Sequence, residues 1–166
     1  MLIVEDGSVV SGANSYATTQ EAIDYFLERG MIVDITDADM IMSTEFLDVT
    51  FGGRYKGKML QSNTQSLLFP RTSFYDTNGR LIEAGVIPKE LKITQFQAAK
   101  LANEGVQLIS GPTSESQLAS FTKTVEGAVS KSESYFAPVN RSQTSYIGSY
   151  IKTILDTSTS GRTVRA

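Results

Sequence analysis

The stretch IPKELKITQFQAAKLANEG, residues 87–105, contains a complete helix signal. Pro88 suits the first turn of a helix, where no backbone N–H is needed, and Gly105 suits the position just after the last turn. The residues between them that share one helix face are Leu91, Gln95, Ala98 and Ala102. This stripe predicts an amphipathic helix that packs against the core of a helical protein.

Two more helices are predicted upstream. Thr18, followed by Glu21 three residues later, forms a capping box, and the helix that it opens stops at Gly30. A second helix begins at residues 36–37 and ends at the glycine pair of residues 52–53. The sequence therefore predicts a turn at residues 12–15 and two helices between residues 18 and 53.

Residues 73–82 read SFYDTNGRLI, two short apolar pieces around Asp-Thr-Asn-Gly. Such a turn places its glycine in the left-handed conformation and predicts a β-hairpin. An EF-hand loop with Gly79 at its sixth position would have Phe74 and Gly85 at its first and twelfth positions, and neither side chain can bind calcium. The sequence therefore favours a turn over a metal site.

The C-terminal part of the chain is richer in Ser and Thr. Weak alternation predicts a β-like excursion over residues 113–138, and the apolar spacing from Tyr146 to Leu155 predicts a short amphipathic helix followed by a flexible tail. We predict a mainly α (α+β) fold, a small helical bundle with a β-hairpin and an extended C-terminal β/helix arm. Its helical core would be residues 1–105 and its C-terminal extension residues 106–166.

The chain of 166 residues contains no Cys and no His. This excludes disulfides, thiol nucleophiles, histidine bases and the usual zinc and haem sites. We predict no catalytic residues, no metal, no cofactor and no enzymatic activity. No apolar run approaches the ~20 residues of a membrane span, and the N-terminus lacks the pattern of a signal peptide. We therefore expect a protein made in the cytosol, without membrane contact.

Charge is unevenly distributed along the chain. Residues 1–52 contain ten acidic residues and one basic residue, whereas residues 53–100 contain eight basic and three acidic residues. The remaining residues, 101–166, contain six basic and five acidic residues. Such asymmetry fits pairing between subunits or contact with a polyanion, and it also fits charges that cancel within one folded domain.

The basic stretch of residues 52–58 reads GGRYKGK. It lacks the spacing of a phosphate-binding loop. Arg54, Lys56 and Lys58 lie within five residues of one another with Tyr55 among them, which favours a contact to DNA or to a neighbouring subunit. A solvated helix exit is the alternative interpretation.

Arg71 follows Pro70 inside an apolar run. Arginine suits a buried, bidentate ion pair. We therefore predict that Arg71 pairs with Glu45 or Asp48 and so holds the hairpin onto the second helix.

Several short motifs, in this order and spacing, resemble one family: Asn14-Ser15-Tyr16, Thr44-Glu45-Phe46-Leu47-Asp48, Arg54-Tyr55-Lys56-Gly57, Phe69-Pro70-Arg71-Thr72, Ile87-Pro88 and Val164-Arg165-Ala166. The chain is similar to the tailed-phage proteins often labelled DnaT-like single-stranded DNA-binding proteins, which are grouped with head–tail connectors. The resemblance covers most of residues 1–105 and the last few residues.

The resemblance implies a structural virion protein, a head–tail adaptor that forms a ring of twelve copies beneath the portal and joins it to the next neck or tail protein. Genomic DNA would pass through the ring without specific contacts. The protein would reside at the head–tail junction of the virion, and in the host cytoplasm during assembly. The residues expected to dock on the portal are Tyr146, Ile147, Tyr150, Ile151, Arg162 and Arg165. The alternative is a single-stranded DNA-binding protein of phage replication that uses residues 54–58.

Overall fold

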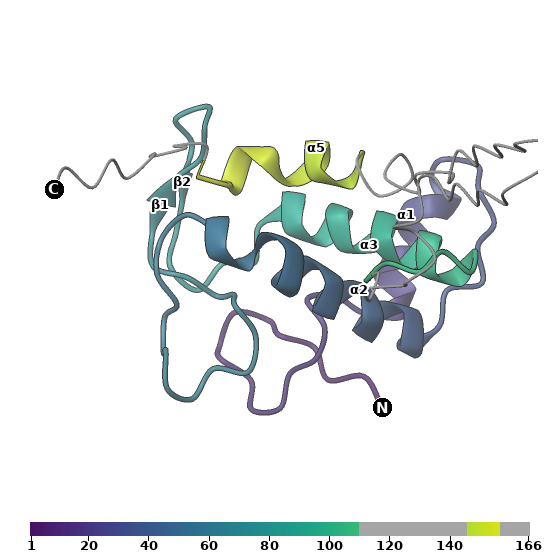
Figure 1. Cartoon of the computed structure of the whole chain (residues 1–166), viewed down its shortest axis with the longest axis horizontal. Helices are drawn as coiled ribbons and strands as arrows, with labels where there is room; N and C mark the ends of the chain where they lie inside the picture. Colours follow the sequence, from purple (N-terminus) through teal and green to yellow (C-terminus); the bar gives the residue numbers. More distant parts are fainter. Residues whose placement is uncertain (110–145, 157–166) are drawn as a thin grey trace, which may run out of the picture.

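The computed structural model describes residues 1–109 and 146–156 (Figure 1). Its helices are α1 (Thr19–Leu27), α2 (Asp37–Phe51), α3 (Lys89–Asn103) and α5 (Ile147–Ile151), with the short 3₁₀ turns η1 (Gly52–Arg54) and η3 (Lys152–Ile154). A two-stranded antiparallel sheet is formed by β1 (Phe74–Tyr75) and β2 (Leu81–Ile82). The predicted mainly α (α+β) fold with a hairpin is confirmed.

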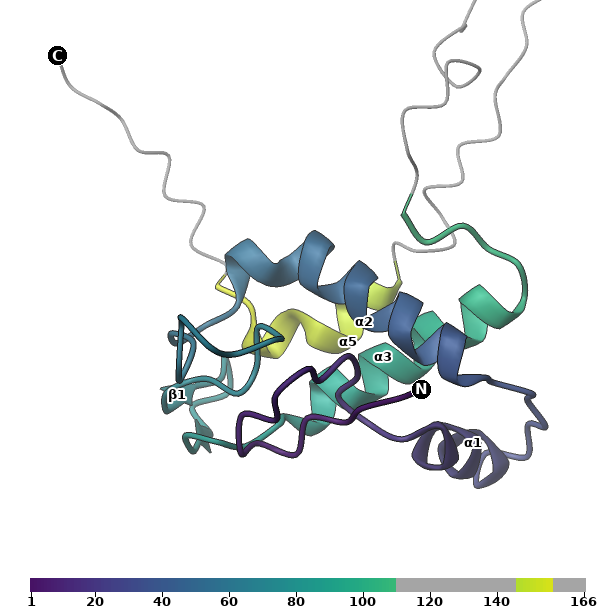
Figure 2. The same cartoon turned by 90° about the horizontal axis from the view of Figure 1, so that it is seen from below.

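Helix α3 organises the helical part of the protein. It packs against both α2 and α5, and the three helices run side by side (Figures 1 and 2). Leu91, Gln95 and Ala98 are fully buried, and Ala102 is half-buried. The apolar stripe predicted from the sequence is therefore the face that α3 turns to its neighbours.

Two hydrophobic clusters hold the elements together. The larger one joins α2, α5 and the chain around the hairpin, and its fully buried members include Leu47, Phe69 and Ile151. The smaller one packs Phe26 of α1 against Phe96 of α3. Burying each of these large side chains contributes about 2 kcal/mol of stability. The clusters fix the relative positions of α1, α2, α3 and α5.

Local signals set the starts of α1 and α2. The Thr18 hydroxyl accepts the backbone N–H of Glu21, whose carboxylate accepts the N–H of Thr18. Thr36 and Asp39 form the same reciprocal pair at the start of α2. Each cap satisfies backbone donors that the first helical turn leaves free and contributes about 1 kcal/mol.

The hairpin places one side of each strand in the core. Phe74 pairs with Ile82 across the strands, and both side chains are buried. The carboxylate of Asp76 accepts the backbone N–H groups of Asn78 and Arg80, both at 2.8 Å. These bonds, the one from Arg80 foremost, hold the pKa of Asp76 below its ordinary value. Its carboxylate therefore closes a turn, as predicted.

The C-terminal segment belongs to the same core as the rest of the protein. Ile147, Ile151 and Ile154 are fully buried in the larger cluster. Leu155 forms an antiparallel bridge with Tyr55. The predicted C-terminal extension is therefore, over residues 146–156, an integral part of the packed structure. The predicted β-like excursion of residues 113–138 and the tail lie outside the described residues.

Candidate functional site

The guanidinium of Arg71 binds main-chain carbonyls. It donates to the oxygens of Lys56 at 2.8 Å, Gly57 at 2.7 Å and Leu68 at 3.2 Å. Burial is the main cause that lowers the pKa of Arg71. With three of its donors on the backbone, Arg71 fastens the chain after η1 to the chain before the hairpin.

These partners correct the predicted ion pair. Among the described residues, no ion pair joins Arg71 to Glu45 or Asp48. Asp48 instead accepts the Tyr16 hydroxyl at 2.6 Å and the Leu68 N–H at 3.1 Å. Glu45 lies exposed on the outer side of α2. Asp48 is near enough to Arg71 for their charges to attract, but the hydrogen bonds of the guanidinium go to main-chain carbonyls instead.

Tyr55, the aromatic residue of the basic stretch, is buried and only 5% exposed. Its ring packs edge-on against Phe69 at 5.0 Å, and its hydroxyl donates to the carbonyl of Leu47 at 3.3 Å. Burial raises its pKa well above the ordinary value. Tyr55 is part of the core and cannot stack on a ligand from solution.

Four basic residues gather at the end of the molecule that carries the hairpin. Arg54 ends η1, Lys56 and Lys58 follow it, and Lys152 begins η3 at the end of α5 (Figures 1 and 2). Main-chain bonds join these segments, because Lys56 N–H donates to Ile154 at 3.1 Å and Asp156 N–H donates to Arg54 at 2.6 Å. We call these four residues the basic end.

The four residues of the basic end are not among the ion pairs found in the described residues. Those ion pairs include Arg29, Arg80, Lys92 and Lys100 instead. The carboxylates of Asp76 and Glu90 are both engaged by Arg80. The side chains of Arg54, Lys58 and Lys152 are exposed, and Lys56 is half-buried. Asp76 lies near enough to Lys56 for their charges to interact, and the backbone of Asp156 bonds to Arg54. The exposed cations of the basic end can nevertheless be reached by phosphate groups in solution.

An exposed aromatic side chain adjoins these cations. Tyr75 is 64% exposed because its neighbour Phe74 takes the inward position of β1. The Lys56 Nζ donates to the carbonyl of Tyr75 at 3.3 Å. Leu81, the cross-strand partner of Tyr75, is also exposed. The sequence analysis did not single out Tyr75. Because successive residues of a strand face opposite sides, an inward Phe74 would have predicted an exposed Tyr75.

Comparison with known families covers the entire chain. Residues 1–166 match the family described as "Putative DnaT-like ssDNA binding protein". The chain belongs to this family. No curated protein and no solved structure was found to match it. The family suggested by the sequence motifs is thus confirmed, and it extends over residues 106–145 as well.

The match corrects the predicted role. The resemblance implied a head–tail adaptor beneath the portal, whereas the description of the matching family is single-stranded DNA binding. The adaptor interpretation is therefore wrong, and the finding favours the alternative. The twelve-membered ring, the portal and neck partners and the virion location were derived from the adaptor role and stay untested.

Of the residues predicted to dock on a portal, those that the structure describes are divided between the core and the surface. Ile147 and Ile151 are fully buried, whereas Tyr146 and Tyr150 are 38% and 40% exposed. Residues four apart share a helix face, so the two isoleucines lie together on the buried face and the two tyrosines lie together on the exposed face. Arg162 and Arg165, also predicted for this role, lie outside the described residues.

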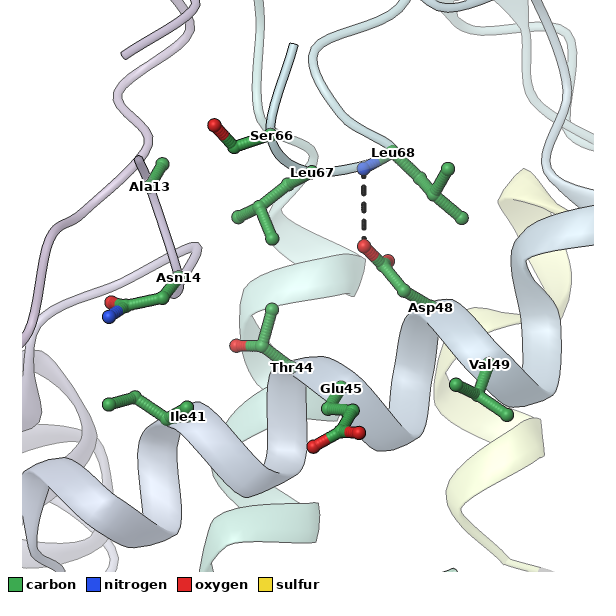
Figure 3. Close-up of a pocket in the computed structure, with 10 residues that line it drawn as sticks. All are labelled: Ala13, Asn14, Ile41, Thr44, Glu45, Asp48, Val49, Ser66, Leu67 and Leu68. Atoms are coloured by element: carbon green, nitrogen blue, oxygen red, sulfur yellow. Dashed lines mark hydrogen bonds between the residues drawn. The ribbon is translucent and has the colours of Figure 1, made fainter. Parts of the chain in front are cut away.

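A cavity of about 440 Å³ lies along α2, between this helix and the loops at residues 13–14 and 66–68 (Figure 3). Its walls are mostly apolar, with Glu45 and Asp48 among the lining residues. Burial raises the pKa of Asp48, and the hydrogen bond from Tyr16 opposes this effect. Two carboxyl groups without a basic residue in the lining make this cavity unsuited to phosphate.

The described residues contain no group of three His, Cys, Asp or Glu side chains arranged to hold a metal ion. Within the same residues, no helix combines the length and apolar character needed to cross a membrane. Of the surfaces described, the basic end with Tyr75 is the one whose chemistry suits a polyanion.

Proposed function

We propose that the protein binds single-stranded DNA at the basic end, with Arg54, Lys56, Lys58 and Lys152 on the phosphates and Tyr75 on a base. The observation that carries the proposal is a cluster of four cations, none of them among the ion pairs found in the described residues, beside an exposed aromatic ring. Single strands are bound in this way, by a positive groove along the backbone and aromatic rings beneath the bases. The family description supports the same ligand.

We also propose that the protein acts by binding alone and catalyses no reaction. A chain without His and Cys has few groups for acid–base or nucleophilic chemistry near neutral pH. Sequence-independent contacts to phosphates and to the faces of bases fit this role, because they need no reactive group.

The test is a salt titration of binding to a fluorescent oligothymidylate of 20 nucleotides, measured by anisotropy. Each cation that no longer neutralises a phosphate makes the slope of log K against log salt shallower by about 0.7 for single strands. The variant Lys56→Ala/Lys58→Ala should therefore bind more weakly, with a slope reduced by about 1.4.

The matched control is Arg29→Ala/Lys92→Ala, which removes the same charge. Both of these residues are in ion pairs, with Glu28 and Glu21, outside the basic end. The control should leave the slope unchanged. An equal decrease of slope in both variants would show that net charge, rather than this surface, governs binding. No binding by the unmodified protein at 50 mM salt would overturn the proposal.

A further inference from the structure

Two tyrosines at α5 are exposed to solvent: Tyr146, the residue just before the helix, and Tyr150 within it. Tyr146 and Tyr150 are 38% and 40% exposed, while Ile147 and Ile151 are fully buried against the core. Residues four apart on a helix are separated by about 6 Å along its axis. The buried isoleucines therefore hold both rings outward, one helical turn apart.

The two rings support each other without covering all of their faces. Their centroids lie 6.3 Å apart with the ring planes at 74°, an edge-to-face arrangement. In such a pair, the ring that offers its edge leaves both of its own faces free of its partner. Tyr146 and Tyr150 thus form a preorganised aromatic step on which planar groups can stack.

This step continues the basic end. Lys152 follows Tyr150 closely at the end of α5, and the bridge between Leu155 and Tyr55 joins it to the cations after η1. From Tyr146 to Leu155 the sequence contains one basic and no acidic residue. Asp156 follows directly and lies beside Arg54, and Lys100 and Glu104 lie near Tyr146. Along α5 itself, a single strand would therefore meet Lys152 and no carboxylate of the helix.

We propose that α5 carries the second part of the DNA path, in which Tyr150 and Tyr146 stack on bases and Lys152 contacts the phosphate backbone between them and the basic end. This inference rests on the proposed function and names a second group of contacting residues. Stacking on tyrosine is tolerant of sequence, since every base has a π face. It therefore predicts length-dependent affinity with little base preference.

The test compares Tyr146→Leu/Tyr150→Leu with Tyr146→Phe/Tyr150→Phe in the full chain, using labelled oligothymidylates of 5 and 20 nucleotides. The leucine variant keeps apolar bulk but loses both rings, so its affinity for the 20-mer should fall about 30-fold. The phenylalanine variant should bind within about twofold of the unmodified protein, because stacking needs the ring and not the hydroxyl. The salt slope should stay the same in both.

A second measurement uses the intrinsic fluorescence of tyrosine. The chain contains seven Tyr and no Trp, so DNA that stacks on tyrosine should quench the emission directly. Quenching should be smaller in the phenylalanine variant, although its affinity is retained. Circular dichroism of each variant checks that the helices are intact.

The outcomes separate the two proposals. If the leucine variant binds the 20-mer as tightly as the unmodified protein while Lys56→Ala/Lys58→Ala binds weakly, the α5 path is wrong and the basic end stands. Equal losses of affinity in the leucine and phenylalanine variants would also overturn the stacking role. If the unmodified protein binds neither oligonucleotide, the proposed function itself fails.

Discussion

Replacing Arg71 by alanine should destabilise the fold by about 3 kcal/mol. The bonds to Lys56 and Leu68 reach half-buried backbone, and each charge-assisted bond of this kind contributes about 1–1.5 kcal/mol after exchange with water. The bond to Gly57 reaches an exposed residue, whose carbonyl water can satisfy, so it adds little. The guanidinium also lies 5.7 Å from the ring centroid of Phe69, which adds about 0.5–1 kcal/mol.

The assay is urea unfolding followed by circular dichroism of the helices, with Arg71→Lys as the matched variant. Lysine keeps the charge but lacks the planar guanidinium that lets arginine donate to carbonyls of separate segments. Arg71→Lys should therefore recover less than half of the lost stability. A loss below about 0.5 kcal/mol in Arg71→Ala would refute the reasoning, because it would mean that the carbonyl bonds contribute nothing net. At low urea, where the variant is folded, its salt slope for DNA should match that of the unmodified protein.

Two further predictions concern single buried contacts. Tyr16→Phe removes a hydrogen bond that opposes the burial of Asp48, so the pKa of Asp48 should rise further in a carboxyl titration by NMR. The pKa of Asp48 is higher in the folded than in the unfolded state, so the free energy of unfolding decreases as pH rises between these two pKa values. Tyr16→Phe should therefore lower the free energy of unfolding more at pH 7, by about 1–2 kcal/mol, than at pH 3. Gly57→Ala should destabilise more than Gly30→Ala in urea unfolding. Both residues have a positive φ, near +74° and +72°, but only at Gly57 would the added Cβ lie 2.8 Å from the carbonyl oxygen of Thr72.

Elements encoded by neighbouring residues were predictable from the sequence. The capping box of Thr18 and the stripe on α3 depend on spacings of three and four residues, which the chain fixes locally. The turn at Asp76 is equally local, because its bonds span two and four residues. These elements form where the sequence predicts them.

Partners across the chain were not predictable in the same way. Arg71 was expected to find a carboxylate, but the chain brings three carbonyls within reach, and carbonyls leave no sequence signal because every residue has one. Tyr55 was expected beside the cations at the surface. Its position depends on the bridge to Leu155, far along the chain, which turns the ring into the core.

The ion pairs of the structure show whether the acidic and basic segments of the sequence neutralise each other. If the acidic and basic segments cancelled each other within the fold, ion pairs should join residues 1–52 to residues 53–100. Among the described residues a single such pair does so, between Lys92 and Glu21. Ion pairing therefore cancels little of the charge of the two segments, although Arg71 and Asp48 also attract each other. For the proposed DNA ligand, such a distribution would disfavour contact with the acidic helices and favour encounter at the basic end, so the association rate should fall as salt is added.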